Sequence, residues 1–118
     1  MLRDFFLGFI RIHILHHAAQ EPVYGLALLQ ELSRHGYELS PGTLYPVLHG
    51  LEQAGYLSRT NQVVGGKIRK YYVITEEGRK VLEEATQKIG ELVGEVLEGE
   101  GPTTLSDIQD VSEGLNTR

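Results

Sequence analysis

The sequence of 118 residues contains no cysteine, which excludes disulfides and thiolate metal sites and favours a reducing cytoplasm. Long hydrophobic runs are absent as well. The most apolar stretch, residues 2–15, carries Arg3, Asp4, Arg11 and His13, so it is too short and too charged to span a bilayer. Because no small-residue cleavage site follows it, we interpret it as a helix of a soluble protein.

Positive charge is also scarce, and the net charge is −5. Residues 1–74 hold seven Lys and Arg against five Asp and Glu, a balance of +2, whereas residues 75–118 hold four against eleven, a balance of −7. Such asymmetry indicates one portion that can meet a polyanion and another that avoids it. The length and the 41% hydrophobic content predict one domain with a modest core.

Hydrophobic periodicity predicts a mainly α chain with a small β-hairpin. Apolar residues at three- and four-residue steps predict a first helix over residues 2–18. Pro22 is expected in the first turn of a second helix that runs to about His35. Ser40, placed as an N-cap before a proline, predicts the start of a third helix that ends near Ala54.

The period changes after the third helix. β-Branched and aromatic residues predict strands over residues 56–64 and 67–74, joined by a two-residue Gly65-Gly66 turn. Thr75 then caps a fourth helix, which should extend to about Leu97.

The end of the chain differs in composition from the rest. Residues 99–118 are polar and acidic, and we expect a mostly disordered tail with a short helical turn near residues 105–111.

The second and third helices are joined by a short connection over residues 36–39, which is the spacing of a helix-turn-helix. One side of the third helix is apolar and should pack on the second helix: Leu44, Val47, Leu48 and Leu51. The other side carries small or hydrogen-bonding groups: Gly42, Thr43, Tyr45, Pro46, His49 and Gln53. Such a surface suits a recognition helix that approaches base edges, although an amphipathic helix in a small bundle has the same pattern.

Pro46 lies inside the third helix. A proline there removes a backbone hydrogen bond and costs about 3 kcal/mol or more. One reason for tolerating it would be a local distortion that exposes the backbone near residues 42–43 to a phosphate.

The second predicted strand concentrates positive charge beside the glycine turn. Alternation places Lys67, Arg69 and Tyr71 on one face and Lys70 and Tyr72 on the other. A wing of this kind can place cations on phosphates or reach into a minor groove. A solvated hairpin protected by edge charge is the alternative interpretation.

Together these segments resemble the PadR family of transcriptional regulators. The residues that carry the resemblance are Ser40-Pro41-Gly42-Thr43-Leu44-Tyr45-Pro46, Leu48-His49-Gly50-Leu51-Glu52, Gly55-Tyr56-Leu57, Arg69-Lys70-Tyr71-Tyr72-Val73-Ile74-Thr75-Glu76-Glu77-Gly78, and Tyr24-Gly25. The resemblance covers about residues 5–97. With one long helix after the wing, the chain is similar to the smaller PadR subfamily.

The resemblance implies a winged helix-turn-helix over residues 21–75, flanked by dimerisation helices over residues 1–20 and 76–98, with 1–98 as one domain. It implies a homodimer that binds DNA and represses transcription until a small molecule or a stress signal releases it. By motif position, it places six residues near DNA: Tyr24, Thr43, Tyr45, Pro46, Arg69 and Lys70. Some members bind aromatic drugs between tryptophans, and this chain departs from them because it has no tryptophan.

The dimer also has support from the spacing of the last helix. Its apolar residues follow 3-4-3-4 steps, a coiled-coil-like seam: Leu82, Ala85, Ile89, Leu92 and Val96. Val93 widens this stripe, and Phe5 and Phe9 of the first helix complete an apolar surface that favours packing across a two-fold axis. Packing of the two helices within one chain is the alternative.

The full set of residues predicted to lie at DNA is Tyr24, Ser40, Gly42, Thr43, Tyr45, Pro46, His49, Lys67, Arg69 and Lys70. Two recognition helices related by a two-fold axis would enter major grooves about 34 Å apart, so the operator should be a pseudo-palindrome. The sparse positive charge predicts a gentle salt dependence. A dimeric adaptor that binds a protein partner through its winged helix is the alternative, favoured by the net acidity and disfavoured by the wing cations.

Three histidines share the first helix. His13, His16 and His17 have a spacing that can hold zinc, but Asp4 and Glu21 lie too far along the helix to complete a site. We therefore interpret them as half-buried or interfacial histidines and predict no metal and no cofactor.

Signatures of catalysis are missing. The chain has no glycine-rich phosphate loop, nucleophile elbow or paired carboxylates, so we predict that it is not an enzyme. A small-molecule pocket between the last helices of the dimer could use Phe5, Phe6, Phe9 and Ile89, although such residues also suit a plain core.

Overall fold

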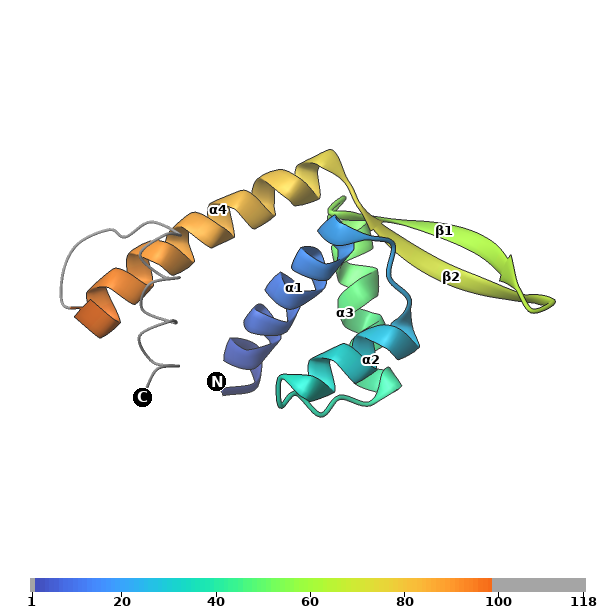
Figure 1. Cartoon of the computed structure of the whole chain (residues 1–118), viewed down its shortest axis with the longest axis horizontal. Helices are drawn as coiled ribbons and strands as arrows, with labels where there is room; N and C mark the ends of the chain where they lie inside the picture. Colours follow the sequence, from blue (N-terminus) through green and yellow to red (C-terminus); the bar gives the residue numbers. More distant parts are fainter. Residues whose placement is uncertain (1, 99–118) are drawn as a thin grey trace. The chain divides into compact units, whose positions relative to one another are not determined.

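The structure of the protein is a computed structural model that describes residues 2–98. The predicted acidic tail, with its expected helical turn, lies outside the described residues. The predicted order of elements is confirmed, except that the fourth helix ends in a π-helical turn (Figure 1). The elements are α1 (Leu2–Gln20), α2 (Gly25–Arg34), α3 (Pro41–Gln53), β1 (Leu57–Val64), β2 (Lys67–Ile74), α4 (Glu76–Val93) and the π-helical turn η1 (Gly94–Glu98).

Within the described residues, the chain divides into two units, residues 2–82 and residues 83–98. The first unit holds α1, α2, α3, the hairpin and the first two turns of α4, and it has the predicted winged helix-turn-helix class. None of the helices within residues 2–98 is both long enough and apolar enough to cross a membrane.

A single hydrophobic core joins the three helices to the base of the hairpin. Its fully buried side chains come from all of these elements: Ile14, Leu28, Leu32, Leu44, Leu48 and Leu57. The predicted apolar side of α3 is confirmed, because its four residues are the buried residues of that helix. Each large aliphatic side chain buried in this way contributes about 1.5–3 kcal/mol relative to an exposed one.

The start of α2 differs from the prediction. The helix begins at Gly25, so Pro22 lies outside it and Val23 forms an antiparallel bridge with Tyr72 of β2. The Val23 N–H donates to the Tyr72 carbonyl at 3.0 Å, and the Tyr72 N–H donates to the Val23 carbonyl at 2.7 Å. The prediction was wrong here because this pairing joins residues far apart in the sequence, which local helix signals cannot show.

The turn of the helix-turn-helix is a Schellman motif. Gly36 has φ +86°, the left-handed conformation that favours glycine. Its N–H donates to the Ser33 carbonyl and the Tyr37 N–H donates to the Leu32 carbonyl, both at 3.0 Å. The motif ends α2 at a defined residue and directs the chain into α3.

The hairpin projects from the core as a wing (Figure 1). Val64 pairs with Lys67 next to the turn, and both turn glycines have positive φ, 59° at Gly65 and 79° at Gly66. These angles match the type I′ turn that suits the twist of a two-residue hairpin. Side chains are buried only toward the base of the wing.

Thr75 caps α4 as predicted. Its Oγ1 accepts a hydrogen bond from the Gly78 N–H at 3.0 Å and donates to the Gly55 carbonyl at 2.6 Å. The cap therefore also fixes the start of α4 to the end of α3. One continuous helix was expected to about Leu97, whereas α4 gives way to the π-helical turn at Gly94.

Candidate nucleic-acid interface

An open groove runs between the outer side of α3 and the wing. It is lined by Tyr45, Pro46 and His49 of α3 and by Arg59, Lys70 and Tyr72 of the hairpin. The groove thus brings together four predicted DNA-binding residues, three from the third-helix motif and one from the wing: Tyr45, Pro46, His49 and Lys70. Arg59 was missed, because on β1 its charge stands alone in the sequence and only the register opposite Tyr72 places it in the groove.

The predicted DNA-binding residues on the outer side of α3 are mostly exposed, and none of them is lysine, arginine, aspartate or glutamate. Ser40, Gly42, Tyr45, Pro46 and His49 are exposed, and Thr43 is half-buried. The helix continues without a break through Pro46 to Gln53. Pro46 has no backbone N–H to donate to the Gly42 carbonyl. Gly42 lies in the first turn of α3 and is exposed.

Ser40 occupies the N-cap position of α3, as predicted, but its side chain makes no capping hydrogen bond. Its hydroxyl lies 3.4 Å from the Thr43 hydroxyl instead. The first turn of α3 thus presents two adjacent hydroxyl groups, which can donate to or accept from a phosphate or a base edge.

Gly25 explains part of the Tyr24-Gly25 motif. A Cβ added at Gly25 would collide with the Tyr45 hydroxyl and lie 2.8 Å from the ring carbon that bears it. Only glycine therefore lets the Tyr45 ring pack over the start of α2, and this contact sets the direction of the ring at the groove.

Arg69 is held by two tyrosines on the other face of the wing. Its guanidinium carbon lies 4.4 Å from the centroid of the Tyr24 ring, and the Tyr24 and Tyr71 rings meet edge to face at 5.4 Å. A hydrogen bond with Tyr71 raises the pKa of Arg69. The alternation predicted from the sequence places Arg69 and Lys70 on opposite faces, so the two cations do not share one surface.

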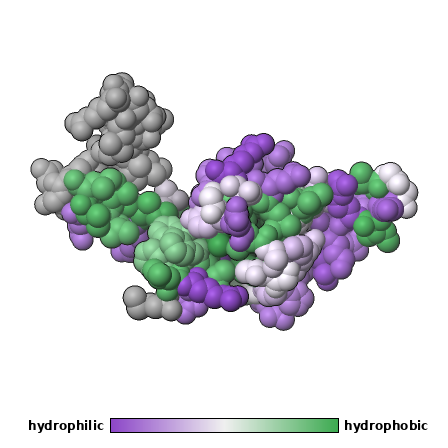
Figure 2. All heavy atoms as spheres, turned by 90° about the horizontal axis from the view of Figure 1, so that it is seen from below, coloured by the Kyte–Doolittle hydropathy of each residue, from purple (hydrophilic) through white to green (hydrophobic). Residues whose placement is uncertain are grey.

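The tip of the wing is apolar rather than charged. Val63 and Ile68 face each other in the register and are 75% and 72% exposed, and Figure 2 shows hydrophobic side chains at this end of the molecule. Lys67 is the only predicted cation beside the turn. Arg69 and Lys70 lie closer to the base of the wing.

Glu52 is the acidic group at the groove. Its carboxylate lies 3.7 Å from His49 Nδ1 and 3.6 Å from Arg59 Nε, so part of the positive charge there is compensated. Within the part of the chain that the structure describes, neither Lys67 nor Lys70 has an ion-pair partner. These two lysines, together with Arg69 stacked on Tyr24, are cations of the wing available to a polyanion.

Apolar side chains are exposed away from the groove, near the N-terminal end of α1. Phe5 is 61% exposed and Phe9 is 38% exposed, and their rings meet edge to face at 5.2 Å. Leu82 packs partly buried against the core of its own chain. In the second unit, Leu92 and Val96 are exposed.

Two of the three histidines of α1, His13 and His17, are half-buried as expected, whereas His16 is exposed. His16 turns away and pairs with Gln20, with 3.2 Å between its Nε2 and the amide nitrogen. His13 and His17 instead lie beside His35 at the end of α2. The proximity of His35 to α1 comes from tertiary packing, which the spacing within α1 could not reveal.

Comparison with known proteins supports the resemblance found in the sequence. The profile of the Transcriptional regulator PadR-like family matches residues 14–84. The chain is 50% identical over 102 residues to "Transcriptional regulator Rv3488" of Mycobacterium tuberculosis, covering 86% of this chain and 95% of that protein.

Two solved structures illustrate the match in fold. A PadR family transcriptional regulator from Eggerthella lenta is 36% identical, with a TM-score of 0.70 over 85% of this chain and 91% of its own. A PadR-like transcriptional regulator from Bacillus cereus is 34% identical, with a TM-score of 0.66 over 79% of this chain and 95% of its own.

Proposed function

Because the chain belongs to the PadR-like family of transcriptional regulators, we propose that it binds an operator on double-stranded DNA as a homodimer and represses transcription by occupying it. The groove between α3 and the wing carries this proposal. It joins a helix surface of hydroxyl and imidazole groups to the lysine-bearing strand. The first can read base edges while the second binds the phosphate backbone.

The two sides of the groove have different tasks. Tyr45 and His49 present hydroxyl and imidazole groups at the groove, and Thr43 adds a hydroxyl in the first turn of the same helix. All three can hydrogen-bond to base edges in a major groove. Lys67 and Lys70 have no ion-pair partner among the described residues and are exposed, so they supply contacts to phosphates. Arg69, stacked on Tyr24, makes a further contact from the face of the wing that it shares with Lys67, opposite Lys70.

The proposed homodimer rests on exposed apolar side chains in each of the two units. Phe5 and Phe9 of α1 are exposed, and in the second unit Leu92 of α4 and Val96 of η1, two residues of the predicted seam, are exposed. A two-fold axis would relate the two α3 helices, so the operator is a pseudo-palindrome with half-sites about one helical turn apart.

Release by a small molecule is part of the proposal. A hollow in the first unit is lined mainly by apolar and aromatic side chains of α1 and of the turn before α3, among them Phe6, Tyr37 and Leu39, and it reaches Thr43. A ligand bound there would contact both α1 and the start of the recognition helix. It could therefore favour a dimer geometry whose recognition helices miss the grooves.

Selection from a random duplex library at near-physiological salt, with sequencing of the bound pool, tests the proposal. We expect enrichment of a two-fold symmetric motif and its loss in the Arg69→Ala/Lys70→Ala variant. The matched control is Lys80→Ala/Lys88→Ala, which removes two lysines of α4 and should retain the motif. A folded dimer that enriches no motif, and that retains a protein partner when Arg69 and Lys70 are replaced, would support the adaptor alternative.

A further inference from the structure

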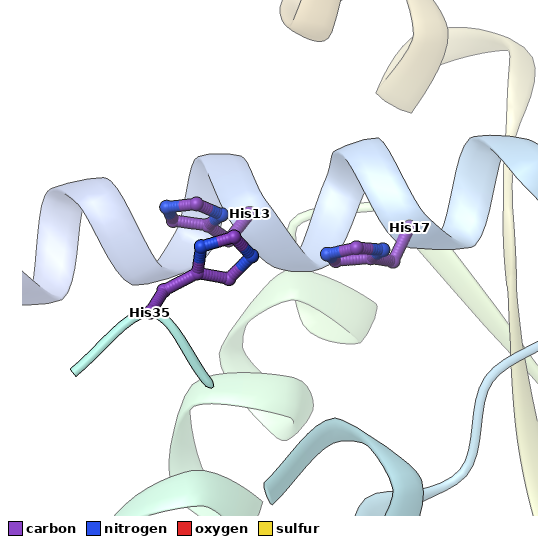
Figure 3. A group of neighbouring side chains, drawn as sticks. All are labelled: His13, His17 and His35. Atoms are coloured by element: carbon purple, nitrogen blue, oxygen red, sulfur yellow. The ribbon is translucent and has the colours of Figure 1, made fainter. Parts of the chain in front are cut away.

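Three imidazoles converge where α1 passes the end of α2 (Figure 3), and the Glu31 carboxylate lies within 4.0 Å of two of them. One ligand atom each of His13, His17 and His35 lies within 4.8 Å of the other two. We propose that this cluster, completed by Glu31, binds one divalent cation of the zinc class and thereby joins α1 to α2. The site is independent of the proposed DNA binding and replaces the expectation that the chain holds no metal.

The elements position the ligands for this role. His13 and His17 are one turn apart on α1, and their rings are nearly parallel, with centroids 6.5 Å apart. His35 is the C-cap of α2, and the Schellman turn at Gly36 fixes the backbone just after it. The His35 ring consequently reaches the His13 ring, with 4.8 Å between the centroids.

Glu31 supplies the fourth ligand. Its Oε1 lies 4.0 Å from His17 Nε2 and 3.9 Å from His35 Nε2, distances that are too long for hydrogen bonds. Arg34 lies 3.3 Å from the other carboxylate oxygen and holds the group in place. Ligand atoms around a tetrahedral zinc ion are about 3.3 Å apart, given bonds of about 2.0–2.1 Å, so small side-chain rotations would close the site.

His17 shows why the cluster calls for a ligand. Its Nε2 is buried and has no hydrogen-bond partner among the described residues, and a buried polar atom left unsatisfied is costly. Burial lowers the pKa of His17, and burial together with the neighbouring imidazoles lowers the pKa of His13. Both shifts favour neutral imidazole, the form that binds metals.

The donor set indicates the class of ion. Imidazole nitrogens suit zinc, nickel and copper, whereas calcium and magnesium require oxygen ligands. Three histidines and one glutamate complete a four-coordinate sphere without water, which is typical of a structural rather than a catalytic site. A bound ion would hold α1, with its exposed phenylalanines, against the helix that leads into the recognition helix.

The test uses the full chain without a histidine tag, stripped with a chelator and titrated with Zn²⁺ in competition with a chromophoric chelator. We expect one zinc ion per chain. Co²⁺ in place of Zn²⁺ should give the strong visible absorption of a four-coordinate site.

His35→Ala is the decisive variant, because this side chain is 45% exposed at a helix end and its removal leaves the core intact. We expect zinc affinity to fall at least about 100-fold, more than the loss of an outer-shell partner produces, and the rise in Tm on adding zinc to disappear. His16→Ala is the matched control, a histidine of the same helix outside the cluster, and should bind zinc like the unaltered chain. Equal zinc affinity in His35→Ala and the unaltered chain, or an equal loss in His16→Ala, would overturn the proposal.

Discussion

The two elements that border the groove are built in opposite ways. α3 buries four aliphatic side chains and has no lysine or arginine on its outer side. The wing buries residues only near its base, and its two lysines have no ion-pair partner among residues 2–98. Base recognition needs side chains held in one position, and the core provides this for α3. Attraction to phosphates needs charge and tolerates movement, and an exposed hairpin provides that.

The largest effect should come from removing a core side chain of α3. Leu44→Ala leaves a cavity at a side chain that is 0% exposed, so we expect the free energy of unfolding to fall by about 2–5 kcal/mol. Val63→Ala at the wing tip is the matched control and should change it by less than about 0.5 kcal/mol. Urea unfolding followed by circular dichroism measures both. Similar losses in the two variants would contradict the contrast between a buried helix and a solvated wing.

Neutralising the wing should weaken DNA binding of every sequence. For Lys67→Ala/Lys70→Ala we expect affinity for the operator and for random duplex to fall about 10–100-fold at moderate salt. The slope of log affinity against log salt concentration should become shallower by about 0.9 for each lost phosphate contact. Fluorescence anisotropy at several salt concentrations measures both quantities. An unchanged salt slope would show that these lysines do not meet phosphates.

Changing the exposed side of α3 should act on specificity instead. His49→Ala is expected to reduce operator affinity about tenfold, within the range of about 1–3 kcal/mol for a base contact, while affinity for random duplex stays the same. Repeating the library selection with this variant should show relaxed preference at one position in each half-site. An equal loss of affinity for all DNA sequences would mean that His49 contacts the phosphate backbone of the DNA instead of a base.

The smallest effect concerns the contact between Gly25 and Tyr45. Gly25→Ala should displace the Tyr45 ring and cost about 1 kcal/mol, at the low end for inserting a methyl group into a packed site. The cost should vanish in a Tyr45→Ala background, because the collision is with that ring. A double-mutant cycle of unfolding free energies measures the coupling. Additive effects would mean that the glycine is needed for another reason.

Features set by neighbouring residues could be predicted from the sequence. The Ser40 position and Pro41 marked the start of α3, Gly36 marked the end of α2, and the paired glycines marked the hairpin turn, since each depends on local backbone preference. The buried side of α3 followed from its period. These signals were sufficient for the fold class and for the motifs at the groove.

What the sequence could not show depends on contacts between distant segments. The start of α2 was misplaced because Val23 pairs with Tyr72, and Arg59 was missed because its position in the groove depends on strand register. The sequence analysis considered only the histidines of α1 and left out His35, because only the packing of α2 against α1 brings His35 close to His13.

The bridge between Val23 and Tyr72 has a mechanical consequence. It places β2 between β1 and the segment that enters α2. The base of the wing is therefore hydrogen-bonded directly to the start of the helix-turn-helix. If a wide or narrow minor groove displaced the tip of the wing, the bridge would pass part of that displacement on to α2. The elasticity of the operator would then count toward its recognition, including at base pairs that no side chain touches.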